Sequence, residues 1–194
     1  MKKNIVIYGS SYPDSIEILK TDNEVNIIGY VNDFSLDEAS WMSKINYLGN
    51  HEIIKELHSD TLIFNNIWSH NNRKLIYQRI MNYGLDVFSY FSDDIIIPNS
   101  SKIGKGNWMH KGVKIGSEVR IGNNCGIRFN TVVNHECSIG SHSFLGPGVV
   151  LSGRVSMGDY SFIGSGAIIL KNICLGENVI VGAGSVGTKN GVDK

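Results

Sequence analysis

His135 and Glu136 are adjacent in the sequence and together carry the side chains of a general base. An imidazole is neutral near pH 7, and a neighbouring carboxylate orients it and keeps it basic enough to accept a proton. The pair lies in the segment NHECSIG, which covers residues 134–140. The residues alone leave two interpretations open, a catalytic base or an exposed histidine on a solvated face.

The stretch around this pair has a period of six residues. Stepping by six from Ile97 meets an aliphatic side chain every time, fifteen in all. The series is Ile97, Ile103, Met109, Ile115, Ile121, Ile127, Val133, Ile139, Leu145, Leu151, Met157, Ile163, Ile169, Leu175 and Val181. Glycine follows nine of these residues, and a small or apolar side chain stands four positions after each, with Asn107 as the exception.

A period of six fits neither a helix nor a flat strand, whose side-chain periods are about 3.6 and 2 residues. A strand that turns a corner after every six residues places the same side chain inward on each side, and glycine tolerates the backbone angles expected at the corners. The pattern resembles that of hexapeptide-repeat proteins, which implies a three-sided left-handed parallel β-helix with 18 residues per coil. Fifteen hexads then form five coils, a stack roughly 20–25 Å tall.

The same register orients the candidate base. His135 follows the inward Val133 by two residues, so its side chain is expected to point outward from the coil. Cys125 and Cys137 fall on the small inward position, and we predict that they fill the core rather than act as nucleophiles.

Residues 1–93 have a different pattern, in which β-branched and aromatic runs alternate with helical stripes. The expected strands are Asn4–Tyr8, Val25–Val31, Thr61–Asn65 and Asp86–Tyr90. The expected helices are Asp14–Lys20, His51–His58 and Asn72–Tyr83, the last with Leu75, Ile76, Ile80 and Met81 on one stripe. This alternation predicts a small parallel sheet with helices packed on it.

The composition excludes several classes of function. The chain has 18 basic and 18 acidic side chains, a balance that does not favour binding to nucleic acid or to an anionic membrane. It has no run of 18 apolar residues, so we expect no membrane span. Its three cysteines form no pair at metal-binding spacing, which predicts a chain without metal in a reducing, cytoplasmic setting.

Segments along most of the chain resemble the sialic acid O-acetyltransferase family of hexapeptide-repeat acyltransferases. They are NIVIYG, EVNIIGYVND, YLGN, NNRKLIYQRI, IPNSSKIGKG, NHECSIG, GPGVVLSG and GAGSVGTKN. The family includes N-acetyltransferases that act on nucleotide-linked 4-amino-4,6-dideoxy sugars, of the bacillosamine and perosamine type. The resemblance implies a Rossmann-like nucleotide-sugar-binding domain over residues 1–93 and a left-handed β-helix acyltransferase domain over residues 94–194.

The resemblance also implies roles for particular residues. His135 matches the catalytic base of the family, and Glu136 matches the carboxylate that orients it. The residues expected to bind the nucleotide sugar are Gly9 and Ser10 in the first loop, Asp33 after the second strand, and Asn130 near the reacting group. The residues expected to bind acetyl-CoA are His142, Phe144, Gly153, Gly164, Gly182 and Ala183, with the Gly153 N–H as a donor to the thioester oxygen.

The sequence departs from the family at three places. The first loop, residues 9–14, has one glycine where the family has several. Phe144 stands where many members have a second histidine. The family continues into a further strand with a G-x-P-A signature, which the sequence up to Lys194 does not contain.

The resemblance implies transfer of an acetyl group from acetyl-CoA to the amine of a nucleotide-linked 4-amino-4,6-dideoxy sugar, in a homotrimer. Two alternatives remain open. One is O-acetylation of a sugar hydroxyl, on sialic acid or a surface polysaccharide precursor, which the same base would serve. The other is a non-catalytic β-helix binding protein, because a fold does not by itself determine a function.

Overall fold

The computed structural model describes residues 2–11, 13–33, 44–67 and 70–191. The chain divides into two compact units, Met1–Phe88 and Ser89–Lys194. The sequence placed the change of pattern between residues 93 and 94. The division lies earlier because Tyr90 and Phe91 form β6 (Tyr90–Phe91), which pairs with β8 (Trp108–Met109) of the second unit.

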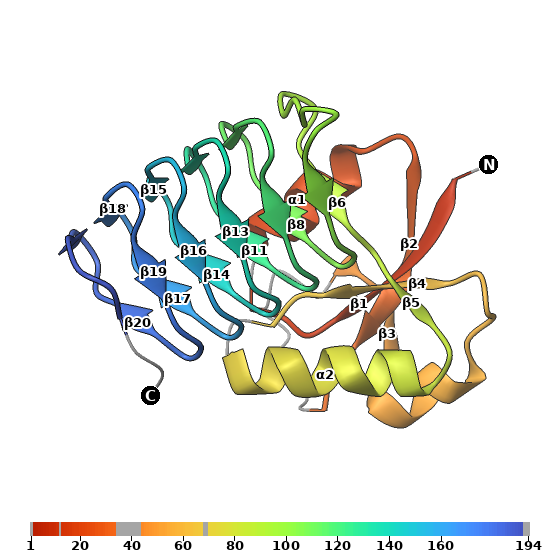
Figure 1. The fold of residues 1–194 in the computed structure, drawn as a ribbon. Coiled ribbons are helices and arrows are strands. Elements are labelled where there is room, and N and C mark those ends of the chain that lie inside the picture. The colour runs from red at the N-terminus through yellow and green to blue at the C-terminus, as the bar shows by residue number, and fades with distance from the viewer. Residues whose placement is uncertain (1, 12, 34–43, 68–69, 192–194) are drawn as a thin grey trace. The chain divides into compact units, whose positions relative to one another are not determined.

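The first unit is built on a five-stranded parallel sheet with the strand order β3-β2-β1-β4-β5 (Figure 1). Its strands are β1 (Lys3–Tyr8), β2 (Val25–Val31), β3 (Tyr47–Gly49), β4 (Leu62–Asn65) and β5 (Asp86–Val87). The central strand β1 is buried on both faces at Ile5, Val6 and Ile7. Continuous burial of this kind is typical of a parallel strand covered on both sides.

The helices of this unit are α1 (Pro13–Thr21) and α2 (His70–Asn82). Proline at the first position of α1 has a backbone angle already suited to a helix. In α2, Ile76 and Ile80 are buried, but Leu75 and Met81 are exposed, so the predicted four-residue stripe is wrong at two positions. Leu75 and Met81 are each displaced by about 100° around the helix from the buried pair.

Two other expectations for this unit also need correction. The segment predicted as a helix over His51–His58 is a 3-10 helix, η2 (His51–Glu56), capped by the Asn50 side chain and followed by extended backbone at Leu57. The predicted strand Asp86–Tyr90 is divided between β5 and β6, which belong to different sheets. The three-residue strand β3 is too short for its pattern to be recognised in the sequence.

The second unit is a parallel β-helix with three faces, each formed by two-residue strands stacked one coil apart (Figure 1). One face contains β7 (Lys102–Ile103), β10 (Arg120–Ile121), β13 (Ser138–Ile139), β16 (Ser156–Met157) and β19 (Cys174–Leu175). The second contains β6, β8, β11 (Gly126–Ile127), β14 (Phe144–Leu145), β17 (Phe162–Ile163) and β20 (Ile180–Val181). The third contains β9 (Lys114–Ile115), β12 (Val132–Val133), β15 (Val150–Leu151), β18 (Ile168–Ile169) and β21 (Val186–Gly187).

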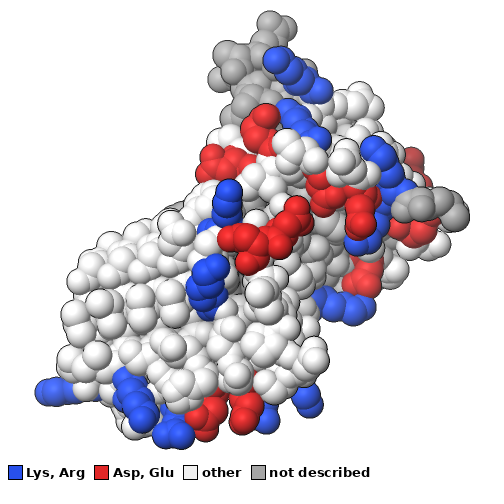
Figure 2. Space-filling model, turned by 90° about the horizontal axis from the view of Figure 1, so that it is seen from above, with Lys and Arg blue, Asp and Glu red and all other residues white. Residues whose placement is uncertain are grey.

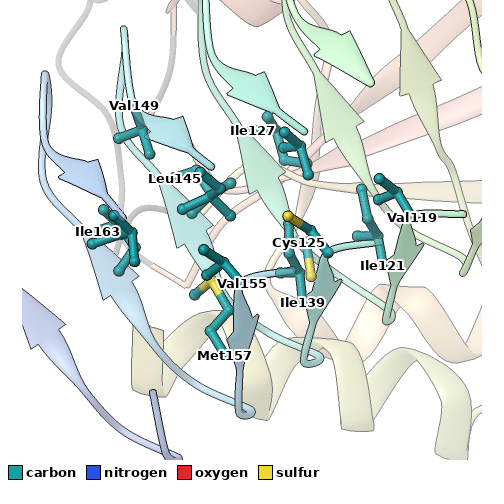
Figure 3. Packing of buried hydrophobic residues seen from close by; sticks show 14 of the residues in the cluster. Val119, Ile121, Cys125, Ile127, Ile139, Leu145, Val149, Val155, Met157 and Ile163 are labelled. Atoms are coloured by element: carbon teal, nitrogen blue, oxygen red, sulfur yellow. The ribbon is translucent and has the colours of Figure 1, made fainter. Parts of the chain in front are cut away.

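Strand pairing confirms the predicted coil length. Arg120 pairs with Lys102 and with Ser138, and this spacing of 18 residues continues along each face. The sequence predicted the inward positions correctly, because the aliphatic residues from Met109 to Leu175 are all buried (Figure 3). Ile97, Ile103 and Val181, near the ends of the stack, are only partly buried.

The corners differ from the expectation. The nine glycines that follow aliphatic residues do not have a positive φ. At Gly104, Gly116, Gly122, Gly140, Gly146, Gly158 and Gly164, a side chain would instead collide with the backbone of the next coil. At Gly116, for example, a Cβ atom would lie 2.6 Å from the His135 nitrogen. The left-handed residue stands three positions after the aliphatic one in the hexads from Ile103 onward. These residues are Gly106, Gly112, Glu118, Asn124, Asn130, Glu136, His142, Gly148, Arg154, Tyr160, Gly166, Asn172, Asn178 and Gly184.

Polar side chains at the small inward position are accommodated by hydrogen bonds between coils. The Ser161 hydroxyl donates to the Gly176 carbonyl and accepts the Val179 N–H. Asn107, the exception to the sequence pattern, is fully buried and follows the same arrangement. Its amide nitrogen donates to the Gly104 and Gly122 carbonyls at 2.8 Å, and its oxygen accepts the Cys125 N–H at 2.7 Å.

We predict that Asn107→Ala destabilises the β-helix by about 1–3 kcal/mol, because it removes the buried hydrogen bond from the Cys125 N–H to the Asn107 amide oxygen. Urea unfolding monitored by circular dichroism measures the change. Asn99→Ala, at an exposed position of the first hexad, is the control and is expected to change stability by less than about 0.5 kcal/mol. Equal unfolding midpoints for the two variants would contradict the structural role of the Asn107 amide.

Candidate active site

The His135 side chain extends from the corner after β12 and is 50 % exposed, as the register predicted. Its imidazole lies over the α-carbon of Gly153, one coil further along. A Cβ atom on Gly153 would lie 2.5 Å from Nε2 and 2.6 Å from Cε1 of the ring. The imidazole therefore occupies space that a side chain at position 153 would fill.

Glu136 completes the pair. Its Oε2 atom is 2.8 Å from His135 Nδ1, so the imidazole donates from Nδ1 to the carboxylate when that nitrogen is protonated. The Nε2 atom is then left to accept a proton. Glu136 has a φ of 59°, a left-handed backbone angle that places its side chain beside the preceding histidine. Sequence analysis identified this pair, and the structure brings the two side chains together.

Arg154 is a third member of the cluster, and sequence analysis did not identify it. Its Nε atom lies 3.1 Å from both carboxylate oxygens of Glu136. Hydrogen bonds from Arg154 first, and then from His135, lower the pKa of Glu136 and keep it ionised. The signal was present in the sequence, because Arg154 follows Glu136 by 18 residues, one coil of the repeat.

A groove of about 360 Å³ borders Glu136 on the face formed by β7, β10 and β13. Its walls are lined by Ser100, Lys102, Glu118, Arg120, Glu136, Cys137 and Ser138. The Cys137 thiol is buried and donates to the Ser152 carbonyl at 3.2 Å. Burial raises the pKa of this thiol, which agrees with its predicted role in the core.

The Gly153 N–H, predicted as a donor to the thioester oxygen, donates to no acceptor in the part of the chain that the structure describes. The His135 ring lies against Gly153, so this N–H is next to the imidazole. A backbone donor next to a general base can stabilise negative charge that develops on a carbonyl oxygen. The site thus combines an imidazole, a carboxylate hydrogen-bonded to it, and a backbone N–H.

The other residues predicted to bind acetyl-CoA lie elsewhere on the coils. His142 stacks on Tyr160 with ring centroids 5.2 Å apart, and Phe144 stacks on Phe162 at the same distance. Gly164 packs against the next coil, where a Cβ atom would lie 2.5 Å from the Ala183 nitrogen, while Gly182 is exposed. Within the described residues no hydrogen bond or ring contact joins this set to His135.

Asn130 is exposed at a left-handed turn with a φ of 57°. Its side-chain oxygen lies against Gly112, one coil earlier. Asparagine is among the residues that most readily adopt a left-handed backbone, so the turn itself accounts for this residue type. The structure shows no hydrogen bond between Asn130 and the cluster of His135, Glu136 and Arg154 among the described residues.

In the first unit, Asp33 lies after β2 at the carboxyl edge of the sheet and is held by three side chains. Its Oδ1 atom is 2.7 Å from His51 Nδ1, and its Oδ2 atom accepts from the Tyr8 hydroxyl at 3.1 Å. Arg79 lies 3.5 Å from Oδ2 and donates to the Tyr8 oxygen at 2.7 Å. Sequence analysis predicted Asp33 here but missed Tyr8, His51 and Arg79, which come from separate elements.

These contacts change the pKa values of the Tyr8 hydroxyl and the Asp33 carboxyl. Burial, and next the charge of Asp33, raise the pKa of Tyr8 to about 12. Partial burial acts to raise the pKa of Asp33, but hydrogen bonds from His51 and Tyr8 outweigh it and lower the pKa below its ordinary value. Asp33 is therefore a fixed negative charge at the edge of the sheet.

The loop after β1 begins at Gly9, where φ is +89° and a side chain would collide with Ile67. The Gly9 N–H donates to the Val31 carbonyl and the Ser11 N–H to the Asn66 carbonyl. These two amides therefore bond within the protein, and Ser10 between them is partly exposed. Tyr12 of the same loop and the last residues, including Lys194, lie outside the described residues.

A second titratable cluster is buried in the β-helix. His110 is fully buried, and its Nε2 atom lies 2.9 Å from a guanidinium nitrogen of Arg128. Burial, together with the charge of Arg128, lowers the pKa of His110 to about 3. Trp108 and Phe129 pack against this histidine with ring centroids 4.2 and 4.0 Å away. A histidine enclosed in this way packs as a neutral core residue.

In residues 2–11, 13–33, 44–67 and 70–191, no group of three or more His, Cys, Asp or Glu side chains is arranged to hold a metal ion. No helix in the described ranges is long and apolar enough to cross a lipid bilayer.

Comparison with known proteins places the repeat in a class of transferase. A family model of bacterial transferase hexapeptide repeats matches residues 154–186. A search of curated proteins returns no significant match to the sequence. The family match confirms the hexapeptide repeat predicted from the sequence. The solved structures that resemble the chain include acetyltransferases.

Three of these structures match nearly the whole chain. PerB from Caulobacter crescentus, solved with CoA and GDP-perosamine, is 25 % identical with a TM-score of 0.88, covering 98 % of this chain and 91 % of its own. The acetyltransferase domain of PglB from Neisseria gonorrhoeae, solved with acetyl coenzyme A, is 18 % identical with a TM-score of 0.89, covering 100 % and 94 %. WeeI from Acinetobacter baumannii is 21 % identical with a TM-score of 0.82, covering 97 % and 92 %.

We predict that Gly153→Ala displaces the His135 imidazole and breaks its hydrogen bond to Glu136. The backbone angle of Gly153 is open to alanine, so the collision with the ring is the only new cost. Imidazole nitrogen NMR resonances report loss of the bond from Nδ1. Ser117→Ala, one coil before His135, is the control and should leave these resonances in place; an unchanged His135 spectrum in Gly153→Ala would contradict the prediction.

Proposed function

We propose that this protein is an acetyl-CoA-dependent N-acetyltransferase that acts on the amine of a nucleotide-linked 4-amino-4,6-dideoxy sugar. The observation that carries the proposal is the hydrogen-bonded pair of His135 and Glu136 above the backbone of Gly153 on a hexapeptide-repeat β-helix. The likeness to PerB, which was solved with CoA and GDP-perosamine, supports both substrates.

In the proposed reaction His135 Nε2 takes a proton from the acceptor amine as the amine nitrogen forms a bond to the acetyl carbonyl carbon. Glu136 stabilises the resulting imidazolium through Nδ1. The carbon–sulfur bond then breaks, and His135 returns the proton to the sulfur, so that CoA leaves as a thiol. No covalent enzyme intermediate is required.

Gly153 has two roles in this proposal. Its missing side chain gives the imidazole its place, and its N–H donates to the carbonyl oxygen while that oxygen carries negative charge. Acetyl-CoA supplies an activated acetyl group when bound. His142, Phe144, Gly164, Gly182 and Ala183 remain the predicted contacts of the pantetheine chain and nucleotide of CoA.

The first unit is proposed to be a Rossmann-like domain that binds the nucleotide. Its strand order, β3-β2-β1-β4-β5, changes direction at β1 and β4. Ligands of open parallel sheets bind beyond the carboxyl ends of the strands at such a point. Gly9 and Ser10 follow β1 and Asp33 follows β2, so the predicted contacts lie at this edge, and Asn130 remains a predicted contact near the acceptor amine.

Association into a homotrimer is also proposed. On the face formed by β15, β18 and β21, Ile168 and Val186 are exposed by 39 % and 55 %, and Leu170 at the adjoining corner by 42 %. Figure 2 shows that the β-helix presents a broad uncharged surface to the viewer in this orientation. Exposed apolar surface on a stack of coils favours packing against another copy.

The three free cysteines fit a reducing cytoplasmic setting.

Release of CoA, followed with a thiol reagent, tests the proposed function. The protein is incubated with acetyl-CoA and a panel of UDP-, GDP- and dTDP-linked 4-amino-4,6-dideoxy sugars. Matched sugars with a hydroxyl group at position 4 form the control panel. Turnover confined to the amino sugars is the expected result. Turnover confined to hydroxyl acceptors would replace the proposal with O-acetylation, and binding of acetyl-CoA without turnover on either panel would indicate a binding protein.

We predict that His135→Ala lowers kcat by about 10²–10⁴-fold, because the acceptor amine loses its general base. Steady-state kinetics with saturating acetyl-CoA measures the effect. His58→Ala removes an imidazole that is 80 % exposed in the first unit and should retain wild-type turnover. Near-normal kcat in His135→Ala would assign the base to another group.

A further inference from the structure

The contacts between Arg154 and Glu136 have no role in the proposed mechanism. It stands one coil after Glu136, and both residues have left-handed backbone angles, with φ of 63° and 59°. Because the two turns are stacked, the side chains leave the coils at equivalent positions. The Arg154 Nε–H donates to both carboxylate oxygens of Glu136, with Nε 3.1 Å from each oxygen.

We propose that Arg154 is a positioning residue for acetyl transfer, which fixes the Glu136 carboxylate so that it holds the His135 imidazole in its productive orientation. This inference rests on the proposed function. The Arg154 N–H donates to the His135 carbonyl at 3.0 Å, but the Arg154 guanidinium contacts the Glu136 carboxylate, which in turn contacts the His135 ring. Arg154 therefore acts on the reaction through another residue.

The need for such a residue follows from exposure. The Glu136 side chain is 38 % exposed, and an exposed carboxylate has several accessible rotamers. The imidazole is limited on one side by Gly153, and the hydrogen bond to Glu136 limits its rotation toward solvent. A guanidinium that contacts both oxygens selects the rotamer in which Oε2 faces Nδ1. Partners of this kind commonly change activity by about 10–100-fold when removed.

The guanidinium also affects the charge of the site. It neutralises part of the Glu136 charge, and its hydrogen bond is the largest cause of the lowered pKa of that carboxyl. The other charged or titratable groups around Glu136 in the groove are Lys102, Glu118, Arg120 and the Cys137 thiol. Arg154 and His135 are the charged groups that act most strongly on Glu136.

Arg154→Gln and Arg154→Lys test the proposal in the full-length protein. For Arg154→Gln we expect kcat to fall by about 10-fold, with unchanged KM for acetyl-CoA and acceptor. Arg154→Lys keeps the charge but not the planar contact with both oxygens, so it should recover part of kcat.

Lys114→Gln, which removes an exposed cation on another face of the coils, is the matched control and should leave kcat unchanged. A raised KM with normal kcat in Arg154→Gln would make Arg154 a substrate contact and overturn the proposal. Normal kinetics throughout would also overturn it. Imidazole NMR of His135 in wild type and Arg154→Gln tests the positioning separately from turnover, so an inactive wild type would defeat the proposed function without hiding the role of Arg154.

Discussion

The structure of the second unit depends on stacking the backbone of each coil directly on the last, 18 residues further along the chain. At a strand separation of about 4.8 Å, the corners of successive coils touch. Contact at the corners explains why glycine follows so many of the aliphatic residues: a Cβ atom there would lie within the backbone of the next coil. It also explains why inward serine, threonine and asparagine side chains are tolerated, since carbonyls and amides of adjacent coils are within reach of their polar atoms.

The same stacking builds the candidate active site. Residues 18 apart in sequence become neighbours, so Gly153 lies beneath His135 and Arg154 lies beside Glu136. The left-handed turn that every coil repeats gives Glu136 and Arg154 a common direction. The repeat thus brings the His135 imidazole, the Glu136 carboxylate, the Gly153 backbone and the Arg154 guanidinium into contact. These groups come from two short segments, residues 135–136 and 153–154.

The two units differ in how well their sequences predicted them. In the β-helix, a period sustained over fifteen hexads predicted the coil, the inward residues and the outward direction of His135. In the first unit, helices and strands were identified by short local patterns, which have no such repetition. Leu75 and Met81 were therefore assigned to the buried stripe of α2 although they are exposed, and β3 was missed because three residues carry too little pattern.

The sequence by itself determined the repeat, the alternation of the first unit, and the pair of His135 and Glu136, because each of these is a local or periodic property of the chain. Tertiary structure alone decided which glycines are needed for corner contacts and which positions are left-handed, since both depend on the path of the next coil. It also decided that Asp33 is held by Tyr8, His51 and Arg79. Those residues are brought together by sheet order and helix packing, long-range relations that no spacing along the chain encodes.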